Sequence, residues 1–198
     1  MADEYLKNKL WCHRMDQVFA LVSSNTDKDR ISLKDWEVWV DNLSEKKGCN
    51  PDSKAFRNVR TILREFCKGM SLTPGREATL DEFKKGVAEF AVVERSKLGK
   101  EELLLSKLNN AWYDAVAPGK DTLALEEYTM LMTACNFREG HAKAAFEHLD
   151  KNESGEVKRS ALNDSEFNFW FSLVGRVQTD GDDPALKSMG MFGPDFEL

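Results

Sequence analysis

The feature that most constrains the fold of this chain is a repeated frame, in which two amphipathic segments flank a polar loop of twelve residues. Around the loop 71–82, apolar residues lie one, four, five and eight places before the loop and at three of the matching places after it. These residues are Met70, Cys67, Phe66 and Leu63 on one side, and Phe83, Val87 and Phe90 on the other. The frame recurs around 116–127, and its first half precedes Asp150. Because this spacing is typical of one face of a helix, each unit is predicted to be helix–loop–helix.

Helical spacing continues over most of the chain and is interrupted by breakers such as Pro74-Gly75 and Pro118-Gly119. No segment alternates apolar and polar residues for long enough to form a substantial strand. The predicted helices are eight and cover residues 4–22, 33–47, 53–70, 80–97, 100–115, 124–135, 139–149 and 161–175. The sequence therefore predicts an all-α protein.

A repeat of about 45 residues built on this frame matches the helix–loop–helix of the EF-hand. The alternative is an ordinary helical bundle with long connectors. We expect four EF-hand-like units in two pairs, packed as one compact domain with an apolar, aromatic-rich interior. The N-terminal pair covers residues 1–97 with loops 23–35 and 71–82, and the C-terminal pair covers 98–175 with loops 116–127 and 150–161. Residues 176–198 form a C-terminal tail that is expected to pack on the domain.

The composition excludes several classes of protein. The 198 residues include 28 Lys and Arg against 34 Asp and Glu, a net charge of −6 without a basic cluster, which argues against nucleic-acid binding. The longest apolar runs have four residues, so no transmembrane segment is expected. The N-terminus lacks the apolar stretch of a secretory signal, and the four Cys residues form no C-x-x-C pair. We expect a cytoplasmic monomer with reduced thiols.

Two of the four loops are predicted to have lost calcium. An EF-hand loop supplies oxygen ligands from positions 1, 3, 5, 7 and 9, a bidentate Glu at position 12, and a Gly at position 6. In the loop 71–82, Arg76 occupies the glycine position and only Glu82 remains as a carboxylate ligand. In the loop 116–127, Lys120 occupies position 5 and only Glu127 remains.

The first and fourth loops keep part of the oxygen supply. Loop 23–35 has one residue too many and no glycine, so it is either a weak metal site or a solvated turn that caps the next helix. Loop 150–161 has the glycine but carries Ala161 in place of the bidentate Glu. The candidate metal ligands, for weak Ca²⁺ or Mg²⁺ binding, are Asn25, Asp27, Asp29, Asp35, Asp150, Asn152, Ser154 and Glu156.

The segment Phe146–Val157 resembles an EF-hand calcium loop with its preceding helix. With its four unevenly spaced units and a tail that ends near Met191-Phe192-Gly193-Pro194, the chain resembles the invertebrate sarcoplasmic calcium-binding proteins. Their relatives include calexcitin, the luciferin-binding protein of sea pansies and the calcium-triggered photoproteins. The resemblance implies two EF-hand pairs around an apolar interior that the C-terminal tail closes.

The interior is predicted to be rich in aromatic side chains, since the chain has 5 Trp, 3 Tyr and 12 Phe. Such residues form either a plain core or the wall of a cavity for an apolar organic ligand. The candidates for a cavity wall are Trp11, Met15, Phe19, Trp39, Phe66, Trp112, Met132, Phe146, Trp170 and Phe171. The resemblance to photoproteins, which hold coelenterazine with a His followed four residues later by Trp-Tyr, places Glu166, Trp170 and Phe171 at these positions.

Three functions follow from these observations. The main hypothesis is an EF-hand protein with degenerate loops that carries an apolar small molecule or serves as a protein-binding scaffold, with Met130, Met132, Met189 and Met191 as contacts for a protein partner. The alternative is a cytosolic calcium buffer or sensor that uses loops one and four. The second alternative is luciferin binding or a photoprotein-like oxygenase activity. The replacement of the His and the Tyr argues against this alternative. No catalytic residues are assigned, and apart from a coelenterazine-type oxygenase the chain is not expected to be an enzyme.

Overall fold

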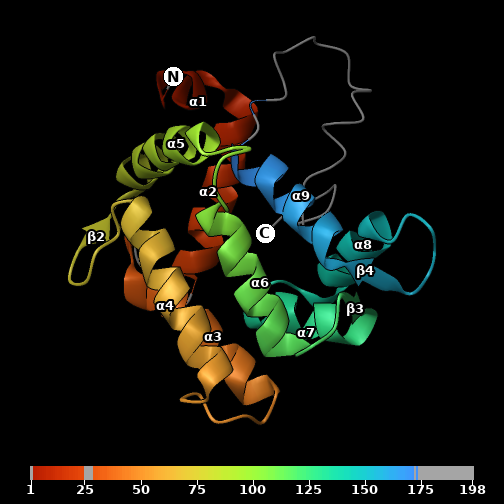
Figure 1. Cartoon of the computed structure of the whole chain (residues 1–198). Helices are drawn as coiled ribbons and strands as arrows, with labels where there is room; N and C mark the ends of the chain where they lie inside the picture. The colour runs from red at the N-terminus through yellow and green to blue at the C-terminus, as the bar shows by residue number, and fades with distance from the viewer. Residues whose placement is uncertain (1, 25–28, 172, 174–198) are drawn as a thin grey trace.

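The computed structural model describes residues 2–24, 29–171 and 173, and it is predominantly helical (Figure 1). The all-α prediction is confirmed. The helices are α1 (Ala2–Lys7), α2 (Lys9–Ser23), α3 (Leu33–Lys46), α4 (Lys54–Gly69), α5 (Leu80–Ser96), α6 (Leu104–Val116), α7 (Leu125–Ala134), α8 (Glu139–Leu149) and α9 (Arg159–Phe171). The short strands are β1 (Ile31–Ser32), β2 (Glu77–Ala78), β3 (Thr122–Ala124) and β4 (Glu156–Lys158).

The prediction of one continuous helix over residues 4–22 is wrong. Asn8 separates α1 from α2, because its Oδ1 accepts a hydrogen bond from the backbone N–H of Trp11 at 3.0 Å and so caps the start of α2. The α1 helix is anchored by Tyr5, whose hydroxyl donates to the carbonyl oxygen of Phe171 at 2.8 Å. The last predicted helix extended to residue 175, but residues 172 and 174–198, which include the predicted tail, lie outside the described part.

The loops meet in antiparallel pairs of strands. β1 pairs with β2, so that Ile31 lies opposite Ala78, and β3 pairs with β4, so that Leu123 lies opposite Val157. Ala78, Leu123 and Val157 are each the eighth residue of their loop in the frame above. This register ties loop one to loop two and loop three to loop four. The division of the chain at residue 97 stays a prediction.

Close packing joins the helices on both sides of this division. α4 packs against α6, and α3 packs against α7, in the middle of the molecule (Figure 1). The fully buried Glu94, near the end of α5, accepts hydrogen bonds from Lys97 Nζ and from the backbone N–H of Leu104, both at 2.6 Å. Glu94 therefore helps to define the start of α6, which begins four residues later than the spacing predicted.

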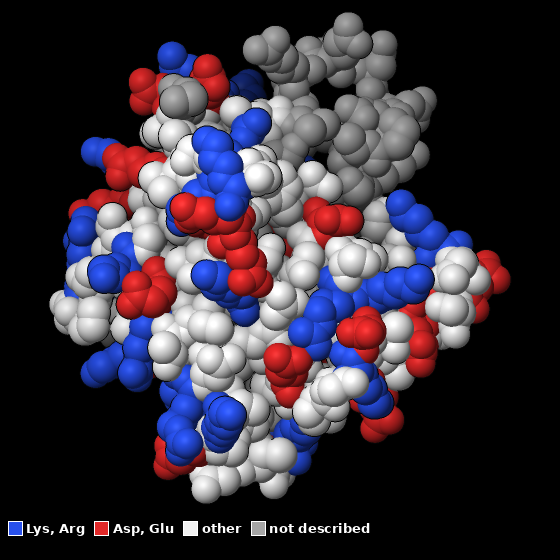
Figure 2. All heavy atoms as spheres, in the orientation of Figure 1, with Lys and Arg blue, Asp and Glu red and all other residues white. Residues whose placement is uncertain are grey.

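One glycine is required by a close helix–helix approach. A Cβ atom on Gly86 of α5 would lie 2.2 Å from the carbonyl oxygen of Met70, at the end of α4, which no side chain tolerates. On the face that Figure 2 shows, Lys and Arg are interspersed with Asp and Glu and form no continuous basic stripe. None of the described helices is both long enough and apolar enough to cross a membrane.

Candidate functional site

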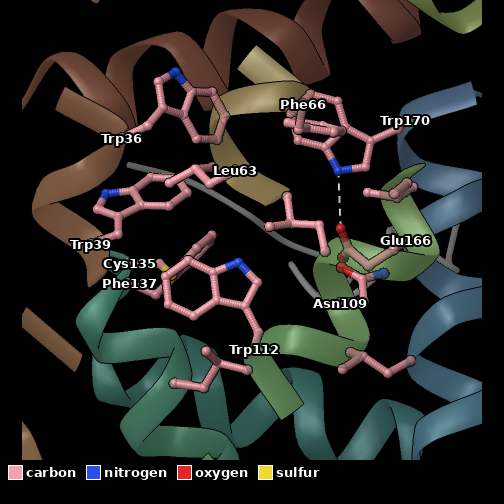
Figure 3. Close-up of a pocket in the computed structure, with 14 residues that line it drawn as sticks. Trp36, Trp39, Leu63, Phe66, Asn109, Trp112, Cys135, Phe137, Glu166 and Trp170 are labelled. Carbon is pink, nitrogen blue, oxygen red and sulfur yellow. Dashed lines mark hydrogen bonds between the residues drawn. The ribbon is translucent and has the colours of Figure 1, made fainter. Parts of the chain in front are cut away.

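The candidate site is a cavity of the interior between helices α3 and α4 on one side and α6, α7 and α9 on the other (Figure 3). Its volume is about 50 Å³. The residues that line it are Trp36, Trp39, Leu63, Phe66, Leu105, Leu108, Asn109, Trp112, Leu131, Cys135, Phe137, Leu162, Glu166 and Trp170. Both halves of the chain therefore contribute to one wall.

Helical spacing explains how the wall is built. The α6 helix contributes Leu105, Leu108, Asn109 and Trp112. Leu108 and Asn109 each lie three or four residues from both Leu105 and Trp112, so the four side chains share one face. The α9 helix contributes Leu162, Glu166 and Trp170 at steps of four. Each helix thus presents one inward stripe to the cavity.

The aromatic side chains meet mostly edge to face. The ring centroids of Trp36 and Trp39 lie 4.9 Å apart at an angle of 60°, and those of Phe66 and Trp170 lie 5.6 Å apart at 82°. Trp36 also approaches Trp170, with 6.3 Å between the ring centroids. Such arrangements are favourable for aromatic rings. The cavity is therefore lined by both the faces and the edges of aromatic rings.

Polar groups are few, and those that face the cavity in Figure 3 lie on α6 and α9; the buried indole nitrogens of Trp36 and Trp39 on α3 also have no hydrogen-bond partner among the described residues. Glu166 is 3% exposed, and its Oε2 accepts a hydrogen bond from the indole Nε1 of Trp170 at 2.9 Å (Figure 3). The buried Nδ2 of Asn109 has no hydrogen-bond partner among the described residues. In Figure 3 the nitrogen edge of the Trp112 ring faces the middle of the cavity. From α6 and α9 the cavity therefore receives a hydrogen-bond-accepting carboxyl group, an amide donor and the indole donor of Trp112.

The surroundings of Glu166 keep neighbouring acids protonated. Burial raises the pKa of the Cys135 thiol, and the charge of Glu166 raises it further. The same two causes, burial first, raise the pKa of Tyr128 well above its ordinary value. At neutral pH both groups remain uncharged, so the Cys135 thiol in the wall is not a reactive nucleophile.

The fourth loop keeps the shape of an EF-hand loop through its own hydrogen bonds. The carboxylate of Asp150 accepts hydrogen bonds from the backbone N–H and the hydroxyl of Ser154, both at 2.9 Å, and from the N–H of Gly155 at 2.7 Å. Burial acts to raise the pKa of Asp150, but these bonds outweigh it and lower the pKa. Because Ala161 supplies no oxygen at position 12, the donor set does not fit tight calcium binding.

In the third loop a lysine stands beside the remaining carboxylate. Lys120 Nζ lies 2.7 Å from Oε1 of Glu127, and the other oxygen of Glu127 accepts the N–H of Ala124 at 3.0 Å. The carboxylate that would bind a dication is thus engaged by an ammonium group and by the helix start. This loop does not fit calcium.

In the first two loops the last carboxylate caps the following helix. Asp35 Oδ2 accepts the N–H and the hydroxyl of Ser32 at 2.6 and 2.8 Å, and Glu82 Oε2 accepts the N–H of Thr79 at 2.9 Å. Of the remaining loop-one candidates, Asp29 is exposed, while Asn25 and Asp27 lie outside the described residues. Asn152 and Glu156 in loop four are exposed. Within the described part, no group of three or more His, Cys, Asp or Glu side chains is arranged to hold a metal ion.

With this geometry established, comparison with known proteins identifies the fold. No family model matches the chain. Obelin from Obelia longissima is 22% identical over 174 residues, which cover 84% of this chain and 86% of obelin. The structure of the Ca²⁺-regulated photoprotein mitrocomin, from the jellyfish Mitrocoma cellularia, matches with a TM-score of 0.76 and 18% identity over 92% of this chain and 90% of mitrocomin. The fold is that of the calcium-regulated photoproteins.

A second solved structure includes a small molecule. The complex of apo-aequorin with (S)-HM-daCTZ matches with a TM-score of 0.76 and 20% identity, over 92% of this chain and 91% of apo-aequorin. The likeness is thus to the photoproteins that the sequence resemblance named as relatives. A specific relation to the sarcoplasmic calcium-binding proteins stays a prediction.

The structure brings part of the predicted cavity wall together. Trp39, Phe66, Trp112 and Trp170 line the cavity. The other candidates belong to the surrounding core and do not line it; they are Trp11, Met15, Phe19, Met132, Phe146 and Phe171. Of the predicted partner contacts, Met130 is half-buried, Met132 is buried, and Met189 and Met191 lie outside the described residues.

Sequence reasoning missed Trp36 and Asn109 and did not include Glu166 in the wall. The spacing of Trp36 and Trp39, three residues apart on one helix, was a usable signal for Trp36. Asn109 lies four residues after Leu105 and three before Trp112, so helical spacing also gave a usable signal for its place on the inward face.

Proposed function

We propose that the interior of this chain binds one aromatic, largely apolar small molecule of the coelenterazine class, and that the protein acts as its carrier. The observation that carries the proposal is the cavity of Figure 3, whose wall contains four indole rings and few polar groups. Ligand pockets of proteins are typically apolar and aromatic with a small number of placed polar groups.

The polar groups define what the ligand presents. Asn109 Nδ2 and Trp112 Nε1 require a hydrogen-bond acceptor, such as a ring carbonyl or a ring nitrogen. Glu166 favours a ligand N–H or O–H group next to Trp170. A fused heteroaromatic ring with a carbonyl group and an N–H group satisfies both demands, whereas a purely hydrocarbon ligand leaves the amide of Asn109 unpaired.

The size of the cavity sets a condition on binding. About 50 Å³ is less than the roughly 150 Å³ of a protein cavity that holds benzene. A ligand with several rings therefore enters only when side chains of the wall move apart.

The comparisons support the proposal through the fold and through one ligand. An apo-aequorin of the same fold is known in complex with (S)-HM-daCTZ. The loop chemistry above supports a carrier whose ligand binding does not depend on calcium. Use of loops one and four as a cytosolic calcium buffer is the competing proposal, and calcium titration of metal-free protein distinguishes the two.

A titration with coelenterazine tests the proposal. Tryptophan fluorescence is expected to be quenched saturably at one ligand per chain, since four of the five Trp residues line the cavity. The variant Trp112→Ala is expected to weaken binding, while Val93→Ala, a control on a 52% exposed side chain, leaves it unchanged. Equal weakening by both variants, or quenching that never saturates, would contradict the proposal.

A second candidate function is oxidation of the bound molecule by oxygen with emission of light. The likeness to calcium-regulated photoproteins favours it. Against it, Glu166 and Phe171 stand where the resemblance places a His and a Tyr. Light emission from protein incubated with coelenterazine in air, before and after calcium is added, tests this candidate. Emission above that of free coelenterazine supports it, and background emission from ligand-loaded protein rejects it.

A further inference from the structure

The third loop, residues 116–127, is surrounded by cationic side chains from three parts of the chain. Lys120 belongs to the loop itself and contacts Glu127 at 2.7 Å. Burial would raise the pKa of Glu127, but the hydrogen bond from Lys120, the N–H of Ala124 and the charges of Lys120 and Lys47 together lower it. Glu127 is therefore held as a carboxylate with positive charge beside it, as it would be by a bound cation.

Lys47 reaches this loop from the N-terminal half of the chain. It follows directly after α3, and its Nζ donates to the carbonyl oxygens of Ala115 and Val116 at 2.5 and 2.6 Å. These carbonyls end α6, where backbone acceptors lack partners within the helix and the helix dipole is negative. Lys47 thus joins the end of α3 to the first residue of the third loop.

Arg159 reaches the same loop from the start of α9. Its Nη2 lies 2.7 Å from Asp114 Oδ1 and 3.2 Å from the carbonyl oxygen of Lys120. Its guanidinium carbon lies 4.7 Å from the ring centroid of Tyr113, a favourable cation–π distance. The loop is consequently tied to α9 as well as to α3.

We propose that Lys47, Lys120 and Arg159 take the place of a calcium ion in the third loop. Lys120 holds the loop to α7 through Glu127, while Lys47 and Arg159 hold the end of α6 to α3 and to the start of α9. The α6 helix carries Trp112 of the cavity wall, and Cys135 of the wall follows α7 directly. The wall is thus set without a divalent ion. This inference rests on the proposed function and adds that calcium does not regulate ligand binding. Whether the third unit is held closed can nevertheless be measured without any ligand.

The three side chains do not contribute equally. The side chain of Lys120 is 56% exposed, so its pairing with Glu127 is screened by water and weak by itself. Lys47 makes two short, charge-assisted hydrogen bonds to acceptors that have no other donor in their helix. We therefore expect Lys47 to be the main contributor.

The chain contains a matched pair of reporters for this closure. Cys135 lies at the end of α7 in the cavity wall, and Cys67 lies in α4 of the other half; both are buried, and burial raises the pKa of both thiols. Opening of the third unit exposes Cys135 alone, whereas global unfolding exposes both thiols. Alkylation of each cysteine, followed by peptide mass spectrometry, gives the two rates in one experiment.

The test compares the full chain with two variants and one control. The variant Lys47→Met loses hydrogen bonds made by a charged group. We therefore expect the alkylation rate of Cys135 to rise about tenfold and that of Cys67 to stay the same. Lys120→Met is expected to have a smaller effect. The control Lys143→Met removes a lysine that pairs with Glu139 at 2.7 Å on the exposed side of α8, and neither rate should change.

The unsubstituted protein provides the second measurement. Its Cys135 rate is expected to be the same in a chelator and in millimolar calcium. A rate that calcium slows tenfold or more would overturn the inference, as would Lys47→Met leaving Cys135 unchanged or exposing Cys67 equally. If Cys135 is protected without calcium but coelenterazine does not bind, the proposed function fails and this inference stands.

Discussion

Replacing Asn109 with leucine tests the polar side of the cavity directly. Asn109 is 8% exposed, and its Nδ2 has no acceptor in the described part of the chain. A buried donor without a partner costs about 1–3 kcal/mol of folding free energy. Leucine has a similar shape and no polar group, so Asn109→Leu removes that cost and leaves the packing nearly unchanged.

We expect Asn109→Leu to raise the free energy of unfolding by about 1–2 kcal/mol. For a chain of this length, a gain of 1 kcal/mol corresponds to a rise in Tm of about 2–4 °C. The affinity for coelenterazine should fall about tenfold, because the ligand loses one hydrogen-bond donor in a buried site. Stability and binding are thus predicted to change in opposite directions.

Calorimetric unfolding and ligand titration of the same samples measure both effects. The matched control is Asn110→Leu on the same helix, since the Oδ1 of Asn110 accepts a hydrogen bond from Asn163 Nδ2 at 3.4 Å. The control should not gain stability. A lower Tm for Asn109→Leu would refute the reasoning, because it would mean that the amide is satisfied in the native protein.

Three further predictions concern stability, metal binding and pH. Glu94→Ala should lower the free energy of unfolding by about 2–3 kcal/mol in urea titrations, because the N–H of Leu104 loses a charged acceptor. Ala161→Glu should raise calcium affinity in loop four by restoring the bidentate ligand, which calorimetry measures; an unchanged affinity would show that the loop frame is wrong. Burial raises the pKa of Tyr113 to about 12, so the unfolding free energy should stay level up to pH 10.0, the ordinary pKa, and fall from there towards pH 12. Tyrosinate absorbance that rises fully around pH 10 would contradict this.

The helix–loop–helix units could be predicted because they depend on the spacing of apolar residues within short stretches of the chain. Apolar residues on both sides of loops 71–82 and 116–127 indicated the helices that the structure contains. The break at Asn8 was not predicted, because a polar residue in an amphipathic stretch is equally consistent with the exposed face of a continuous helix.

The site depends on contacts that local spacing does not encode. Trp36 and Glu166 line one cavity only because α3 packs on α4, α4 on α6 and α6 on α9, although 130 positions separate the two residues in the sequence. Lys47 is the last residue of the predicted helix 33–47, and its contact with the carbonyl of Val116 exists only in the folded chain. By contrast, the loss of oxygen ligands from the calcium loops was evident from the residue types alone.

Calorimetric titration of coelenterazine into metal-free protein, in a chelator and again in millimolar calcium, tests the central claim most directly. We predict saturable binding of one molecule per chain, with the same affinity in both conditions. The account is contradicted if no heat of binding is observed in the chelator, or if calcium changes the affinity tenfold or more.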